Sequence, residues 1–148
     1  MTIPKRILLV EDDAAVCDLL AEFLTSQDFG VVQASNVDTA LAALGTDGPF
    51  DLAVLDFWLE DTTAIPIMDA LASHGRRTPV IAISGGNEII DMEAVQALND
   101  ISGAVTFLQK PFAKETLIDA VKAALQACRD DISTTTRIFS FLLLMAMI

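Results

Sequence analysis

Short runs of consecutive apolar residues alternate with longer amphipathic segments along the chain. Apolar runs of four or five residues are typical of buried strands, whereas apolar residues three and four positions apart indicate one face of a helix. The predicted strands are Ile7–Val10, Val31–Ala34, Leu52–Leu55, Pro79–Ile83 and Ala104–Leu108. The predicted helices cover residues 14–27, 36–44, 65–73, 91–99 and 114–128.

Local signals mark several ends of these elements. Asn36 or Ser35 can cap the second helix, because a side-chain oxygen at the cap accepts a hydrogen bond from a free backbone N–H group. Gly45 predicts the end of that helix, and Pro66 fits the first turn of the next one. The pair Gly85–Gly86 breaks the chain after the fourth strand.

Five strand–helix units with solidly apolar strands predict an α/β fold, a doubly wound parallel sheet with helices on both faces. In such sheets, functional sites lie at the carboxyl ends of the strands. The residues at those ends with carboxylate, hydroxyl or ammonium side chains are Glu11, Asp12, Asp13, Asp56, Ser84 and Lys110. In a doubly wound sheet of order 2-1-3-4-5 the first and third strands are neighbours, so the acidic residues would converge.

Each of these residues also has an ordinary structural explanation, since polar residues normally follow buried strands and Asp13 can simply cap the first helix. Together they indicate a site. Glu11, Asp12 and Asp56 would repel one another without a cation, and a hard ion such as Mg²⁺ (or Mn²⁺) relieves that repulsion. A carboxylate can act as a nucleophile toward phosphorus, with Lys110 to neutralise the phosphoryl charge and Ser84 to hydrogen-bond an oxygen.

Four segments resemble response regulator receiver domains, the phosphorylation switches of two-component signalling. They are residues 7–13 (ILLVEDD), 51–56 (DLAVLD), 83–86 (ISGG) and 107–112 (FLQKPF), and the resemblance covers about residues 5–128. It implies the flavodoxin-like receiver fold with a five-stranded parallel sheet in the order 2-1-3-4-5.

The resemblance also implies roles for individual residues. Asp56 accepts a phosphoryl group from a histidine kinase or phosphotransfer protein, and Glu11 and Asp12 match the acidic pair that holds Mg²⁺. The backbone carbonyl of Trp58 matches a further metal ligand. Lys110 matches the phosphate-binding lysine, whose bond to the following proline is cis in family members.

Ser84 and Phe107 match the family's switch hydroxyl and switch aromatic, although Phe107 can also be plain core packing. Phosphorylation would draw the Ser84 hydroxyl toward the phosphate and let Phe107 turn inward. The surface formed by residues 91–99, 104–108 and 114–128 would then change. A downstream protein target would read that surface, which is also a candidate homodimer face.

The loop after Asp56 departs from the family pattern. Glu60 and Ala64 stand where family members commonly have proline and glycine, which leaves the geometry of the loop open. Trp58 is then either a hydrophobic lid over the site or an interface residue.

Composition narrows the class of protein. The length of 148 residues suits one domain, and the net charge of −12 with nine scattered basic residues argues against direct DNA binding. The start of the chain lacks a signal-peptide pattern, and two distant cysteines form no disulfide framework, so a cytoplasmic protein is expected.

We therefore expect a receiver domain over residues 1–128 and an apolar tail over 129–148, with no recognisable output domain. The apolar run Ile138–Ile148 is too short to span a bilayer. It can self-associate, which we favour, or dock on its own receiver or on a membrane surface.

Other functions remain as alternatives. A degenerate receiver would act as an interaction module without phosphorylation. A metal-dependent phosphohydrolase typically has a second acid two residues after its nucleophile, where this chain has Trp58. A flavin or nucleotide module would have a glycine-rich first turn instead of Glu11–Asp13. The leading expectation is a signalling protein that is not an enzyme beyond its own phosphorylation and dephosphorylation.

Overall fold

The structure is a computed structural model and describes residues 3–60, 62–73, 78–85 and 105–128. The helix predicted over residues 91–99 and the tail over residues 129–148 lie outside these ranges.

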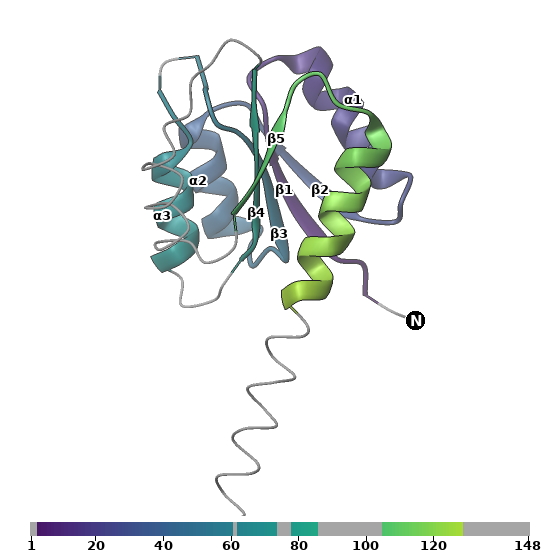
Figure 1. Ribbon diagram of the computed structural model, residues 1–148. Coiled ribbons are helices and arrows are strands. Elements are labelled where there is room, and N and C mark those ends of the chain that lie inside the picture. The colour runs from purple at the N-terminus through teal and green to yellow at the C-terminus, as the bar shows by residue number, and fades with distance from the viewer. Residues whose placement is uncertain (1–2, 61, 74–77, 86–104, 129–148) are drawn as a thin grey trace, which may run out of the picture.

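Five parallel strands form a single sheet in the order β2-β1-β3-β4-β5 (Figure 1). They are β1 (Arg6–Val10), β2 (Gly30–Ala34), β3 (Leu52–Asp56), β4 (Val80–Ser84) and β5 (Val105–Gln109). The predicted α/β fold with its doubly wound sheet and strand order is confirmed. Every strand of the predicted set is present, with bounds that differ by one residue at one end or both.

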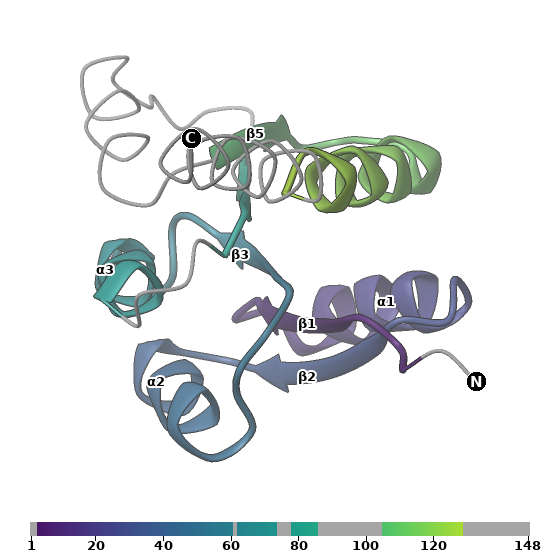
Figure 2. The same cartoon turned by 90° about the horizontal axis from the view of Figure 1, so that it is seen from below.

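Helices cover both faces of this sheet. They are α1 (Ala14–Thr25), α2 (Val37–Thr46), α3 (Ile65–Ser73) and a helix over residues 114–128. Figure 2 shows α2 and α3 on one face, with α1 and the helix over residues 114–128 on the other.

Strand alternation divides the core into two layers, because successive side chains of a strand point to opposite faces. Leu8 and Val10 pack with α2 and α3, in what we call the α2/α3 core. Ile7 and Leu9 pack with α1 and with Leu117 of the helix over residues 114–128. These four apolar side chains of β1 are fully buried, which explains the unbroken apolar run in the sequence.

The helix caps settle two of the sequence predictions. Asn36, and not Ser35, caps α2: its side chain accepts from the Thr39 N–H at 2.8 Å, and the two residues form a capping box. The end predicted at Gly45 is wrong. The helix continues through Thr46 because the Asp47 N–H still donates to the Ala43 carbonyl at 2.8 Å.

Arg6, at the amino end of β1, contacts the segment that leads into β3. Its backbone N–H donates to the Asp51 carboxylate at 2.8 Å, and its guanidinium lies 5.1 Å from the centre of the Phe50 ring. The guanidinium also donates to the Asp47 carbonyl. These contacts fix the segment that leads into β3, and so they fix the strand that ends at Asp56.

Among the residues that the structure describes, no helix is long and apolar enough to cross a membrane.

Candidate functional site

Three carboxylates meet at the carboxyl ends of β1 and β3. Asp56 is the last residue of β3, and Glu11 directly follows its neighbour β1. One carboxylate oxygen each from Glu11, Asp12 and Asp56 lies within 4.8 Å of the others. Glu11 is 2% exposed and Asp56 6% exposed, while Asp12 lies nearer the solvent. The structure thus brings together the three acidic side chains that the sequence selected as metal ligands.

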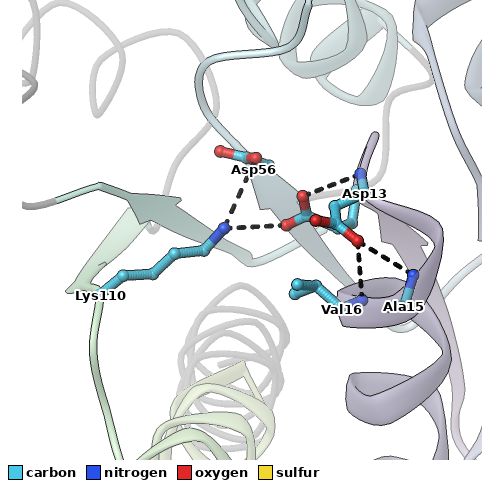
Figure 3. A network of polar contacts seen from close by, with 6 residues as sticks. Asp13, Ala15, Val16, Asp56 and Lys110 are labelled. Atoms are coloured by element: carbon cyan, nitrogen blue, oxygen red, sulfur yellow. Dashed lines mark hydrogen bonds and ion pairs between the residues drawn. The ribbon is translucent and has the colours of Figure 1, made fainter.

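Lys110 reaches into this cluster from the segment after β5. Its Nζ lies 3.1 Å from Glu11 Oε2 and 3.7 Å from Asp56 Oδ2 (Figure 3). Its backbone N–H donates to the Ser84 carbonyl at 2.7 Å, which ties the segment to the end of β4. The Lys110–Pro111 peptide bond is cis, as the resemblance implied.

Asp13 has a different task from its two acidic neighbours. Its Oδ1 accepts from the Ala15 and Val16 N–H groups at 3.0 and 3.2 Å (Figure 3), and it is the N-cap of α1. Its own N–H donates to Glu11 Oε1 at 3.2 Å. The helix-capping explanation of Asp13 is confirmed, and the same residue orients the Glu11 carboxylate.

The close packing of these charges shifts two pKa values. Burial first, and then the charge of Glu11, raise the pKa of Asp56 to about 7 from its ordinary value of 3.8, against an opposing effect of Lys110. Burial by itself would lower the pKa of Lys110, but the carboxylates of Asp56 and Glu11 raise it overall. Lys110 therefore remains charged, and the metal-free Asp56 carboxyl is hard to ionise.

This donor set fits a divalent cation that prefers oxygen. Carboxylate oxygens are the protein ligands that Mg²⁺ and Mn²⁺ select, and one Lys110 ammonium leaves part of the negative charge of three carboxylates uncompensated. A bound cation would supply that compensation and would return the Asp56 pKa toward its ordinary range.

The loop after Asp56, whose geometry the sequence did not determine, is held by backbone contacts between its two ends. Trp58 and Thr63 form an isolated antiparallel bridge, and the Leu59 N–H donates to the Thr62 carbonyl at 2.8 Å. Ala64 is fully buried, and its N–H donates to the Phe57 carbonyl at 2.9 Å. Trp58 is 40% exposed, and the role of its carbonyl as a metal ligand stays a prediction.

Ser84 and Phe107 occupy different depths on neighbouring strands. Ser84 is the last residue of β4 and is 7% exposed, and in the sheet register Asp56 pairs with the preceding Ile83. Phe107 is half-buried and packs against the α2/α3 core. Its ring neighbour Phe57, which lies 6.5 Å away between ring centres, is not among the residues predicted for the site. An aromatic residue directly after the predicted phosphoacceptor was the available signal.

A family model for the response regulator receiver domain matches residues 7–122. The chain belongs to this family. Receiver domains bind Mg²⁺ at an acidic pocket and interact with histidine kinases or phosphotransfer proteins, and the carboxylate cluster described above has the composition of such a pocket.

Two similar proteins are a response regulator and a receiver domain of known structure. Response regulator MprA of Mycolicibacterium vanbaalenii is 31% identical over 128 residues, which cover 86% of this chain and 53% of that protein. The crystal structure of the receiver domain of NtrX from Brucella abortus is 30% identical, with a TM-score of 0.68 over 81% of this chain and 98% of that one.

A third solved structure supports the fold. The CheY-like receiver domain protein of Methanospirillum hungatei has a TM-score of 0.75 and 23% identity, over 87% of this chain and 99% of that one. The chain spans about half of MprA, and 26% of the nitrogen assimilation regulatory protein NtrX of Azorhizobium caulinodans.

Proposed function

We propose that this receiver domain is a phosphorylation-dependent switch of a two-component system, with Asp56 as the phosphoacceptor. The phosphodonor is a histidine kinase or a phosphotransfer protein, and the output passes through protein–protein contacts. The observation that supports this most directly is the buried Asp56 carboxylate, which lies among two further carboxylates and 3.7 Å from the Lys110 ammonium.

The transfer needs a nucleophile, a charge-neutralising group and an in-line leaving group. An Asp56 oxygen donates an electron pair to phosphorus and forms the new P–O bond. The P–N bond to the donor imidazole breaks, and its electron pair stays on the imidazole nitrogen. The Lys110 ammonium, now 3.1 Å from Glu11 Oε2, turns to the phosphoryl oxygens as their charge develops.

Glu11, Asp12, Asp56 and the Trp58 carbonyl would hold Mg²⁺, which supplies further neutralisation of the phosphoryl oxygens. The raised pKa of Asp56 gives the metal site a second purpose. Since a protonated carboxyl is a poor nucleophile, burial and the charge of Glu11 hold Asp56 in a state that phosphorylates well only with a cation nearby.

Readout uses the adjacent strands. The Ser84 hydroxyl, at the end of β4, would bond a phosphoryl oxygen on Asp56, and Phe107 on β5 would respond to its movement. The chain acts chemically on itself alone, through phosphorylation and hydrolysis of its own aspartyl phosphate. With a net charge of −12, it contacts protein partners and not DNA directly.

The test uses the whole chain with Mg²⁺ and acetyl phosphate, followed by intact mass. The expected result is a gain of one phosphoryl group, which is lost in Asp56→Asn and on chelation of the metal. Asp69→Asn, which changes an exposed carboxylate of α3, serves as the matched control and should keep the full gain.

Two outcomes contradict the proposal. One is no mass gain in the wild-type chain, which would favour an interaction module that works without phosphorylation. The other is a gain that survives Asp56→Asn, which would place the phosphoryl group on another residue.

A further inference from the structure

Three aromatic rings form a continuous set of contacts from the loop after Asp56 to β5. The ring centres of Phe57 and Trp58 are 5.4 Å apart with the planes at 89°. Those of Phe57 and Phe107 are 6.5 Å apart at 63°. Both are edge-to-face arrangements, which the charge distribution of aromatic rings favours. Phe57 is the middle member and is 4% exposed.

The sheet register explains why Phe57 and Phe107 can meet across β4. Ala82 of β4 pairs with Leu55 on one side and with Phe107 on the other. Leu55 and Phe57, two residues apart, both belong to the α2/α3 core, so they share a face. Ala82, the β4 neighbour of Phe107, carries only a methyl group, and this leaves space beside the Phe107 ring on the face that Phe57 reaches directly after β3.

Phe57 is also held tightly to its own surroundings. Its N–H donates to the Ile83 carbonyl of β4 at 2.9 Å, and its carbonyl accepts from the Ala64 N–H at 2.9 Å. It is covalently bonded to Asp56. Any displacement of the Asp56 backbone therefore moves the Phe57 ring, because packed interiors transmit small shifts instead of absorbing them.

We propose that Phe57 is a positioning residue for Phe107, and that it carries the displacement of Asp56 to β5 through the ring contact, alongside the route through the Ser84 hydroxyl. This inference rests on the proposed phosphorylation of Asp56. A role in core packing alone would make Phe57 matter for stability but would leave the response of Phe107 to phosphorylation unchanged.

The experiment labels the eight phenylalanines of the whole chain with fluorine and follows them by ¹⁹F NMR. The Phe107 resonance is assigned by its loss in Phe107→Leu. Each sample is treated with Mg²⁺ and acetyl phosphate, and intact mass gives the extent of phosphorylation. In the wild-type chain the Phe107 resonance should shift on phosphorylation. In Phe57→Leu, phosphorylated to the same extent, the shift should fall to less than roughly half of that value.

Phe50→Leu is the matched control. Phe50 belongs to the same α2/α3 core and is 2% exposed, but it precedes β3 and so lies at the far end of the sheet. It should keep the full shift. If Phe57→Leu fails to fold, Phe57→Met is read in the same way against Phe50→Met, since methionine keeps most of the volume without the ring.

The outcomes separate this inference from the function on which it rests. A phosphorylated Phe57 variant with the full Phe107 shift overturns the inference and leaves the switch intact. An unphosphorylated wild-type chain overturns both, and intact mass alone reveals it. In Ser84→Ala, phosphorylated on Asp56, a residual Phe107 shift supports the second route, whereas complete loss of the shift overturns it.

Discussion

At the scale of single residues, Asp56 is placed where its charge is costly without a cation. Its carboxylate is buried at the end of β3 beside Glu11, and the Lys110 ammonium offsets only part of the repulsion. The raised pKa of about 7 expresses that cost. A site that stores electrostatic repulsion in this way binds a cation readily and accepts a phosphoryl group once the cation is present.

This cost should appear as a pH dependence of stability. The Asp56 pKa is higher in the folded chain than its ordinary value of 3.8, so the folded state holds the proton more tightly than the unfolded state. The resulting stability is fully present below about pH 4 and is lost as the pH rises toward about 7. Asp56→Asn removes this titration. Without metal, the free energy of unfolding of Asp56→Asn should therefore rise relative to that of the wild type by on the order of 2 kcal/mol between those pH values.

Urea unfolding in the presence of a chelator measures this difference. Asp69→Asn, on the surface of α3, should follow the wild-type pH dependence. Mg²⁺ should then stabilise the wild type at about pH 8 far more than Asp56→Asn, because binding to the folded state adds to its stability. A wild type and an Asp56→Asn variant with parallel pH profiles would contradict the electrostatic account of the site.

The site residues that directly follow a strand could be predicted, because the end of each apolar run marks their position. Asp56 and Ser84 follow apolar runs, and the parallel order brings those ends together. The ion pair between Lys110 and Glu11 joins residues 99 positions apart, and side-chain direction over such a separation depends on packing that no local pattern contains. The ring contact of Phe57 with Phe107 depends on the small Ala82 as the β4 neighbour of Phe107, which only the register shows.

At the scale of elements, the start of α2 offers a direct test of capping. Both Ser35 and Asn36 have side chains of the capping type, but only the Asn36 side chain accepts from the Thr39 N–H. Asn36→Ala should therefore lower the free energy of unfolding by about 0.5–2 kcal/mol. Ser35→Ala should stay within about 0.5 kcal/mol of the wild type, as exposed substitutions away from special contacts do.

Thermal or urea unfolding of the two alanine variants decides between them. Equal losses of stability in both would show that the cap is shared. A larger loss in Ser35→Ala would reverse the assignment.

Element boundaries were predictable to within a residue or two, and the reasons for the differences are local. β3 and β4 extend to Asp56 and Ser84 because these polar residues keep their ladder partners, Ile83 and Gln109. The loop after β3 was the least predictable element. Its bridge between Trp58 and Thr63 depends on backbone hydrogen bonds. The residues Glu60 and Ala64, which replace the family's usual proline and glycine, do not by themselves predict whether those hydrogen bonds form.

At the scale of the whole molecule, apolar patterning alone gave an α/β sheet, and the four receiver-like motifs added the strand order. The two kinds of information are complementary. Periodicity shows which segments are buried, whereas the order of parallel strands depends on crossovers that periodicity does not contain. The confirmed order puts β1 between β2 and β3, and it is this neighbourhood that brings Glu11 to Asp56.

The apolar run Ile138–Ile148 carries the last prediction, which concerns assembly. A run of eleven residues dominated by leucine, methionine, isoleucine and phenylalanine exposes apolar surface unless something covers it. We propose that a second copy of the chain covers it. The whole chain should then elute in size-exclusion chromatography as a concentration-dependent oligomer, and a chain that ends at residue 132 should elute as a monomer.

A full-length double variant, Leu142→Ser with Leu144→Ser, separates apolar contact from chain length and should also elute as a monomer. Phosphorylation of each variant on Asp56, measured by intact mass, shows that its receiver domain is folded, because the site needs β1, β3 and the segment after β5 in register. Identical elution of all three chains at every concentration would overturn self-association through this run. Any oligomer that forms would then have to use another surface of the receiver domain, and the surface that includes β5 and the helix over residues 114–128 would be the next to test.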